Sequence, residues 1–228
     1  MHIPDGYLGP PTYAALWAAM LAVWRSAAMK VKKTMKAAET PLLALGAAVS
    51  FVIMMFNVPV VGGTTGHATG SALLSIVLGP WAAVIAVSIA LAVQALLFGD
   101  GGITSYGANC FNMAFVGAIV GGAVYRMLRA TGGGKKKRTV LAAGLAGYAS
   151  LNASAFCAAL ELGVQPLLHH AADGRPLYSP FPLSVTIPAI VGAHLAVYGL
   201  VEAAFTMLAV AYLQKAYPEL IGIKNITQ

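Results

Sequence analysis

The fold depends on how residues 69–98, TGSALLSIVLGPWAAVIAVSIALAVQALLF, are divided into helices. The run is apolar over a length that could cross a bilayer once as a single helix. Its one interruption is Gly79-Pro80, and proline both ends a helix and suits the first turn of the next. We therefore predict a hairpin of two short helices, at 69–82 and 83–98, in place of one long span.

The composition places the chain in a membrane. Of its 228 residues, 59% are hydrophobic and 9% are charged, whereas about 25% of the residues in an ordinary soluble domain are charged. We predict an all-α membrane protein with a single transmembrane domain over residues 1–228. Its seven predicted helices span residues 12–28, 39–57, 69–82, 83–98, 108–128, 139–163 and 184–213.

The basic residues predict the orientation of these helices. If the N-terminus lies outside, seven helices put 13 of the 14 basic residues on the cytoplasmic side, which is the side that basic loops prefer. A six-helix count would put the two basic loops on opposite sides, so we predict seven helices and a cytoplasmic C-terminus. The basic residues thus report topology and not a nucleic-acid partner. Only Arg175 is predicted outside, and the other 13 are Arg25, Lys30, Lys32, Lys33, Lys36, Arg126, Arg129, Lys135, Lys136, Lys137, Arg138, Lys215 and Lys224.

The first apolar run is not typical of a cleaved signal peptide. It lacks a basic segment before it, and the only charged side chain preceding it is Asp5. We therefore expect Met1 to be retained and to face outward. Three polar segments, Met1–Pro11, Asn57–Gly70 and Gly99–Gly107, are then predicted on the same outer face.

The N-terminus carries a specific metal-binding pattern. With histidine at position two, the α-amino nitrogen, the amide nitrogen of His2 and its imidazole can hold one metal in a plane, leaving a fourth position open. His67, in a glycine-rich outer loop, could fill that position. Four planar nitrogens suit Ni(II) or Cu(II), and affinity should fall at low pH because the donors must lose protons. The alternative from residue types alone is two ordinary solvated histidines.

Three stretches resemble one known family. The opening MHIPDGYL (1–8), the loop PVVGGTTGH (59–67), and QALLFGDGG (94–102) with GAN (107–109) are similar to the NikM/CbiM family. Members of that family are the substrate-capture (S) subunits of energy-coupling-factor transporters for nickel and cobalt. The resemblance extends over nearly the whole chain.

The resemblance implies an architecture and a set of site residues. It implies a six-helix S-component core with an extra N-terminal helix, and a metal bound by Met1, His2 and His67. Thr64, Asp100 and Asn109 are expected in a surrounding shell or in the loops that close the site. Residues 4–6, Pro-Asp-Gly, favour nickel over cobalt, so we expect Ni(II) as the transported substrate, with Co(II) as the alternative and no organic cofactor.

The resemblance also implies partners in a bacterial or archaeal plasma membrane. These are a transmembrane coupling (T) subunit and two cytoplasmic ATPase subunits, with a small accessory membrane subunit as a further candidate, all amid membrane lipid. No phosphate-binding G-x-x-x-x-G-K-[ST] motif and no H-E-x-x-H motif occurs, so we expect a non-enzymatic chain. A proton-coupled secondary transporter using His194 and Glu202 is the rival hypothesis, and we expect His169 and His170 to be solvated loop residues.

Overall fold

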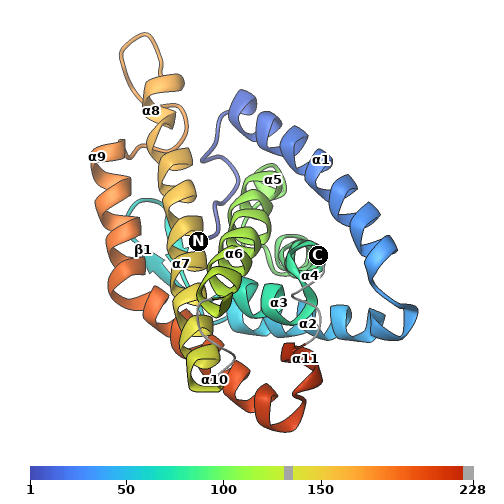
Figure 1. Ribbon diagram of the computed structural model, residues 1–228. Helices are drawn as coiled ribbons and strands as arrows, with labels where there is room; N and C mark the ends of the chain where they lie inside the picture. The colour runs from blue at the N-terminus through green and yellow to red at the C-terminus, as the bar shows by residue number, and fades with distance from the viewer. Residues whose placement is uncertain (131–135, 223–228) are drawn as a thin grey trace.

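The computed structural model describes residues 1–130 and 136–222, which form a bundle of helices (Figure 1). The α-helices are α1 (Pro10–Thr34), α2 (Thr40–Met54), α3 (Ser71–Leu78), α4 (Pro80–Val93), α5 (Tyr106–Asn109), α6 (Gly117–Ala130), α7 (Lys136–Gly163), α8 (Gln165–Leu168), α9 (Leu183–Thr186), α10 (Gly199–Ala216) and α11 (Glu219–Gly222). A 3-10 turn, η1 (Ala37–Glu39), precedes α2, and π-helical segments continue several helices: η2 (Gln94–Phe98), η3 (Cys110–Val116), η4 (Ile187–Val191) and η5 (His194–Tyr198).

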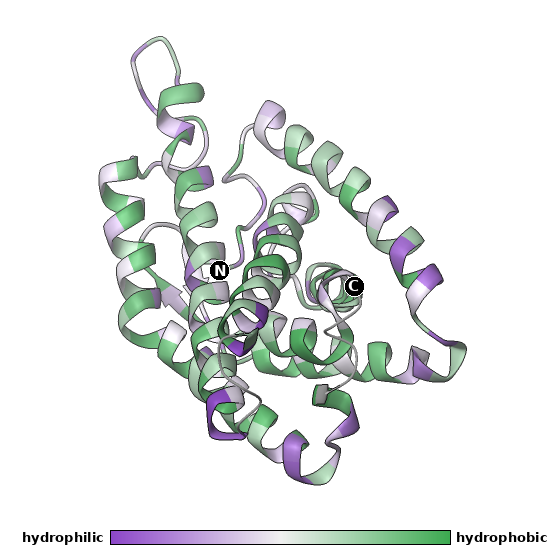
Figure 2. Cartoon of the chain, viewed as in Figure 1, coloured by the Kyte–Doolittle hydropathy of each residue, from purple (hydrophilic) through white to green (hydrophobic). Residues whose placement is uncertain are grey.

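Helices cover all seven predicted segments, but they differ in length and in hydropathy. Within the described residues, five are long and apolar enough to cross a membrane: Ala37–Met54, Pro80–Phe98, Tyr106–Ala130, Lys136–Leu168 and Leu183–Ala216. Figure 2 shows apolar residues along the length of these helices. The chain is therefore a multi-pass helical membrane protein.

The break between the two helices in residues 69–98 falls earlier in the chain than predicted. α3 ends at Leu78 and α4 begins at Pro80, so the boundary lies at Gly79 and not after residue 82. Gly79 has φ 87°, a backbone conformation that favours glycine, and Pro80 occupies the first position of α4. The eight residues of α3 span about 12 Å, well short of the thickness of a bilayer core.

The first helix is longer than predicted. α1 extends from Pro10 to Thr34, beyond the predicted 12–28, and packs against α4 and α5. Its last turn carries Lys32 and Lys33, whose charges suit the negative end of a helix dipole. Two residues used in predicting the topology, Lys135 and Lys224, lie outside the described residues.

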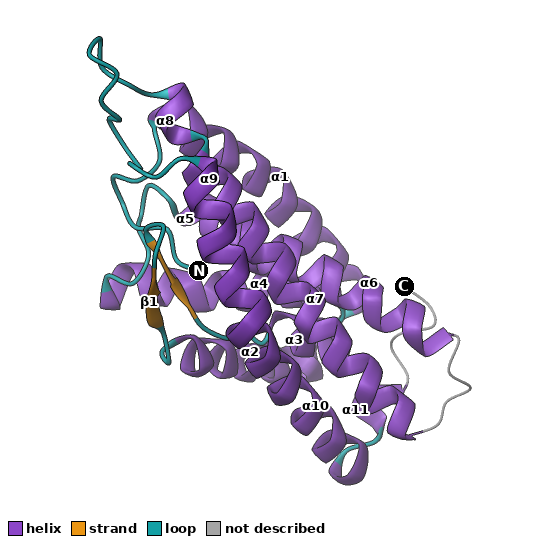
Figure 3. Ribbon diagram, turned by 90° about the vertical axis from the view of Figure 1, so that its left-hand side faces the viewer, coloured by secondary structure: helices purple, strands orange, loops and turns teal. Residues whose placement is uncertain are grey.

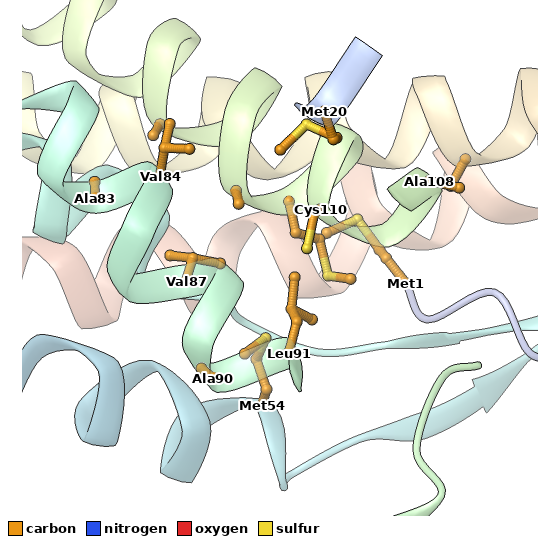
Figure 4. Packing of buried hydrophobic residues seen from close by; sticks show 14 of the residues in the cluster. Met1, Met20, Met54, Ala83, Val84, Val87, Ala90, Leu91, Ala108 and Cys110 are labelled. Atoms are coloured by element: carbon orange, nitrogen blue, oxygen red, sulfur yellow. The ribbon is translucent and has the colours of Figure 1, made fainter. Parts of the chain in front are cut away.

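The core of the bundle is built around α4 and α7. α7 packs against α6 and α10, and α4 packs against α2. Small residues permit these close approaches: a Cβ added to Gly121 of α6 would lie 2.8 Å from the Cβ of Ala72 in α3. Figure 4 shows a large part of the buried hydrophobic cluster, including Leu91 and Cys110.

A short β-hairpin lies at the end of the bundle where the loops gather. Strands β1 (Val58–Val60) and β2 (Thr64–Gly66) pair antiparallel, with Val60 opposite Thr64. The glycine-rich sequence of this segment had predicted only a loop in an all-α fold. Figure 3 shows this hairpin beside the N-terminus. Gly62 and Gly63 form the turn with φ values of 107° and 89°, and β2 ends directly before His67.

Candidate metal site

The N-terminal residue is anchored in the hydrophobic core. The side chains of Met1 and Ile3 are both 0% exposed. In Figure 4 the Met1 side chain extends toward Cys110 and Leu91, and all three belong to the same buried cluster. Because an apolar side chain strongly favours such a position, Met1 fixes the location of its own α-amino group.

The next residues are held by hydrogen bonds from two loops. The Asn109 side chain pairs with Ile3, accepting from its N–H at 2.8 Å and donating to its carbonyl at 3.0 Å. The Thr64 hydroxyl donates to the His2 carbonyl at 2.8 Å. The Asp5 carboxylate accepts from the backbone N–H of Thr104 at 2.8 Å. The peptide therefore enters the bundle in one defined conformation.

The α-amino group of Met1 is buried and lies against the hairpin. It donates to the carbonyl oxygen of Thr65 and lies 3.2 Å from the Thr65 hydroxyl. Burial lowers the pKa of this amine well below its usual value, and the nearby Asp100 carboxylate only partly opposes the effect. A neutral amine keeps a lone pair that can bind a metal.

The His2 ring is held with its Nδ1 lone pair available. Its Nε2 lies 3.2 Å from the side-chain oxygen of Gln94, which can only accept, so Nε2 carries the proton. Nδ1 is buried and has no hydrogen-bond partner within residues 1–130 and 136–222. Burial, and then the Met1 amine, lower the pKa of this ring to about 3. The 3.4 Å approach of Nδ1 to Asp100 is therefore not an ion pair.

His67 presents the opposite ring nitrogen. Its Nδ1 lies 3.0 Å from the Ala68 carbonyl and donates to it, which leaves Nε2 unprotonated. Nε2 is buried and has no partner in the described part of the chain. Burial lowers the pKa of His67 well below its usual value, and a charge on the neighbouring Met1 amine or on His2 would lower it further. The His2 and His67 rings stack, with centroids 4.6 Å apart and planes inclined by 22°.

The structure brings the predicted residues Met1, His2 and His67 together. It also places the predicted Thr64, Asp100 and Asn109 around them, with Asp100 accepting a 2.7 Å hydrogen bond from Asn57. Among the described residues, no group of three or more His, Cys, Asp or Glu side chains could hold a metal ion. A site built from two imidazoles and two backbone nitrogens needs no such group.

Sequence reasoning missed Gln94 and Thr65 as contacts of the site. Gln94 is the one amide in an apolar helical segment, and such a residue is expected to face a polar cavity. The Nδ1 atom of His194 lies 2.7 Å from the Ile190 carbonyl. His194 and Glu202, named in the proton-relay alternative, have separate partners, since Glu202 binds the backbone of Thr69.

Comparison with known proteins identifies the family. The sequence profile described as "cobalt uptake substrate-specific transmembrane region" matches residues 2–220. A fused nickel transport protein of Rhodobacter capsulatus is 52% identical over 97% of this chain, and a putative metal transport protein of Methanocaldococcus jannaschii is 43% identical over 99% of it. This chain covers 64% of the Rhodobacter protein and 96% of the Methanocaldococcus protein.

Solved structures agree with that result. A crystal structure of a truncated transition metal transporter superposes with a TM-score of 0.91 and is 52% identical, covering 95% of this chain and 99% of its own. These relatives are transporters and not enzymes, and the apolar helices match a location in the cell membrane. The chain therefore belongs to the NikM/CbiM family of nickel and cobalt transport proteins.

Proposed function

We propose that this chain captures Ni(II) at the extracytoplasmic face of the membrane, as the S subunit of an energy-coupling-factor importer. Four nitrogens form the site: the Met1 amine, the amide and imidazole Nδ1 of His2, and Nε2 of His67. The observation that carries the proposal is that His2 Nδ1 and His67 Nε2 are both buried without a partner in the described chain. A buried polar atom without a hydrogen-bond partner destabilises the fold, unless a bound ligand or ion pairs with it.

The ring stacking supports a planar arrangement. In the N-terminal chelate three nitrogens occupy three corners of a square around the metal. The His2 amide nitrogen takes the corner between the Met1 amine and the His2 imidazole. The open corner is thus next to the His2 imidazole, so the imidazole that supplies the fourth nitrogen must lie beside that ring. His67 lies there, with its centroid 4.6 Å away. Square-planar nitrogen coordination is typical of Ni(II) and Cu(II).

The topology proposed with this function has seven spans, an external N-terminus and a cytoplasmic C-terminus. The loop-bearing end in Figure 3, which holds the N-terminus, then faces outward. A T subunit and two cytoplasmic ATPase subunits supply the energy for release, and a small accessory membrane subunit is a further candidate partner. Cobalt is the alternative substrate, because relatives include cobalt transport proteins 38–39% identical over 56–57% of this chain.

The N-terminal amine provides the sharpest test. We would measure nickel binding to purified protein with a native N-terminus and to protein that carries one extra residue before Met1. The extension turns the Met1 amine into an amide, so nickel affinity should fall at least about 100-fold. Losing a nitrogen ligand costs more affinity than losing a residue that only orients a ligand. A cleavable leader, whose removal regenerates the Met1 amine, is the matched control and should restore binding. Equal binding before and after cleavage would exclude the four-nitrogen geometry.

A further inference from the structure

A buried carboxylate holds the backbone just beyond His67. Glu202 of α10 is 0% exposed, and its carboxylate accepts from the Thr69 N–H at 2.7 Å. Both of its oxygens lie 3.1 Å from the Gly70 N–H. Thr69 and Gly70 are the second and third residues after His67, so this carboxylate lies against the short connection between His67 and α3.

This connection requires an acceptor at that point. Gly70 has φ 72° and forms the N-cap of α3, where backbone N–H groups have no partner inside the helix. From the other side, the Ser50 hydroxyl donates to the Thr69 carbonyl at 2.8 Å. Thr69 is thus held by α2 through its carbonyl and by α10 through its N–H. The segment has little freedom to rotate and carry His67 away.

The same long helix also contacts the segment before His67. A Cβ added to Gly62 would lie 3.1 Å from the side chain of Ile190, and one added to Gly66 would overlap the ring of Tyr198. Ile190, Tyr198 and Glu202 all belong to the continuous helix Leu183–Ala216. This helix therefore supports the chain on both sides of His67.

The opposite side of this helix is exposed. Leu200, Val201 and Leu208 are 57%, 50% and 72% exposed, while Glu202 is fully buried. A shift of the helix would thus be transmitted to the His67 loop through the Glu202 carboxylate, because the carboxylate bonds the loop backbone directly. Among the described residues, Glu202 is the only carboxylate that accepts a hydrogen bond from the backbone between Thr64 and Gly70.

We infer that Glu202 is a positioning residue for nickel: it holds His67 Nε2 at the fourth corner of the metal site through the Thr69 and Gly70 backbone. The inference rests on the proposed four-nitrogen site. Glu202 itself does not bind the metal. Its contribution is to the geometry of the site, so a change at this position should alter the ligand field of the bound nickel as well as the affinity.

The test uses full-length protein with its native N-terminus and the substitution Glu202→Gln. Glutamine keeps the size of the side chain but replaces one acceptor oxygen with an NH₂ group that would face backbone N–H donors. We expect nickel affinity to fall about 10-fold or more, as for other residues that orient metal ligands, with a shifted visible absorption band of the bound nickel. Glu161→Gln is the matched control, because the half-buried Glu161 carboxylate accepts a hydrogen bond from the Asn112 side chain instead.

A second variant covers the case in which Glu202→Gln does not fold. Glu202→Asp keeps both oxygens and the charge but withdraws them by one methylene, and we expect a weaker, shifted nickel complex here too. Wild-type affinity and an unchanged absorption band in either folded Glu202 variant would overturn the inference while leaving the proposed site intact. Absence of nickel binding in the wild-type protein would overturn both. Glu161→Gln should match the wild type within about two-fold, well below the cost of losing an orienting contact.

Discussion

Two pairs of histidines lie in the loops of this protein, and they differ in their surroundings. His2 and His67 are 3% and 1% exposed, and their rings stack on one another. His170 is exposed, and its Nδ1 lies 3.2 Å from the Ala171 carbonyl, while His169 packs edge-on against Tyr178. Burial, an accepting partner on one ring nitrogen and stacking against a second imidazole together distinguish His2 and His67 from the other pair. Adjacency in sequence does not provide these surroundings.

The largest effect is expected from His67→Ala. This change removes the fourth nitrogen and leaves a gap beside the His2 ring, so nickel affinity should fall at least about 100-fold, more than the loss of an outer contact costs. Competition with a fluorescent chelator measures the affinity. Retained helical circular dichroism would show that the fold survives. A loss of less than about three-fold would mean that His67 is not a ligand.

The next largest effect is expected from removing the side-chain oxygen of Gln94, which accepts a hydrogen bond from the buried His2 ring. In Gln94→Met the side chain keeps its length but no longer accepts from His2 Nε2, so the proton is free to move to Nδ1. We expect nickel affinity to fall about 10-fold, as for other partners that orient a metal-bound histidine. Asn152→Leu is the control, since the Asn152 amide donates to the Tyr148 carbonyl within α7, away from the His2 ring. Equal affinities in these two variants would contradict the tautomer argument.

The helices and the residues that meet at the candidate site could be predicted from the sequence, but the roles of Gln94 and Glu202 beside them could not. The length of an apolar run predicts a membrane-spanning helix, and a histidine at position two predicts an N-terminal metal chelate. Both are local properties of the chain. Gln94 and Glu202 act on residues far from them in sequence, His2 and Thr69. Only the packing of η2 and α10 reveals which polar group each one meets.

Local backbone details were also beyond prediction. Gly79-Pro80 indicated a break, yet the exact boundary depends on the positive φ of Gly79, which is set by how α3 and α4 pack together. The β-hairpin before His67 has strands of only three residues each. Such strands are too short for an alternating pattern to be recognised, so glycine content alone predicted a loop.

The burial of the site leads to a prediction about protons. Burial lowers the pKa of the Met1 amine well below its usual value and that of His2 to about 3, so these two groups hold fewer protons at pH 6.5 in the folded protein than in an exposed peptide. Nickel binding should then release fewer protons from the protein, mainly the proton of the His2 amide. A free peptide with the sequence of residues 1–6 should release about 2.5, because its amine and half of its imidazole are protonated at this pH.

Calorimetry in two buffers of different protonation enthalpy counts these protons. The lowered pKa values of the Met1 amine and His2 also affect stability. Below about pH 8 the unfolded chain binds more protons at these groups than the folded chain does. The stability of the metal-free protein should therefore decrease as the pH falls from 8 toward 5. Equal proton release by protein and peptide would show that the N-terminal donors are not kept neutral by burial.

The smallest effect is expected from His169 and His170, of which only His170 is exposed; His169 was expected to be solvated but is half-buried against Tyr178. His170→Ala removes a side chain at the surface, and His169→Phe keeps a ring against Tyr178 while removing both ring nitrogens. Because neither ring belongs to the buried stack, nickel affinity at the N-terminal site should stay within about two-fold of the wild type, below the cost of losing an orienting contact. A drop of about ten-fold in both variants would place this pair on the path to the site. A drop in His169→Phe alone would trace to the packing of His169 against Gly9, which lies between residues 1–8 and α1.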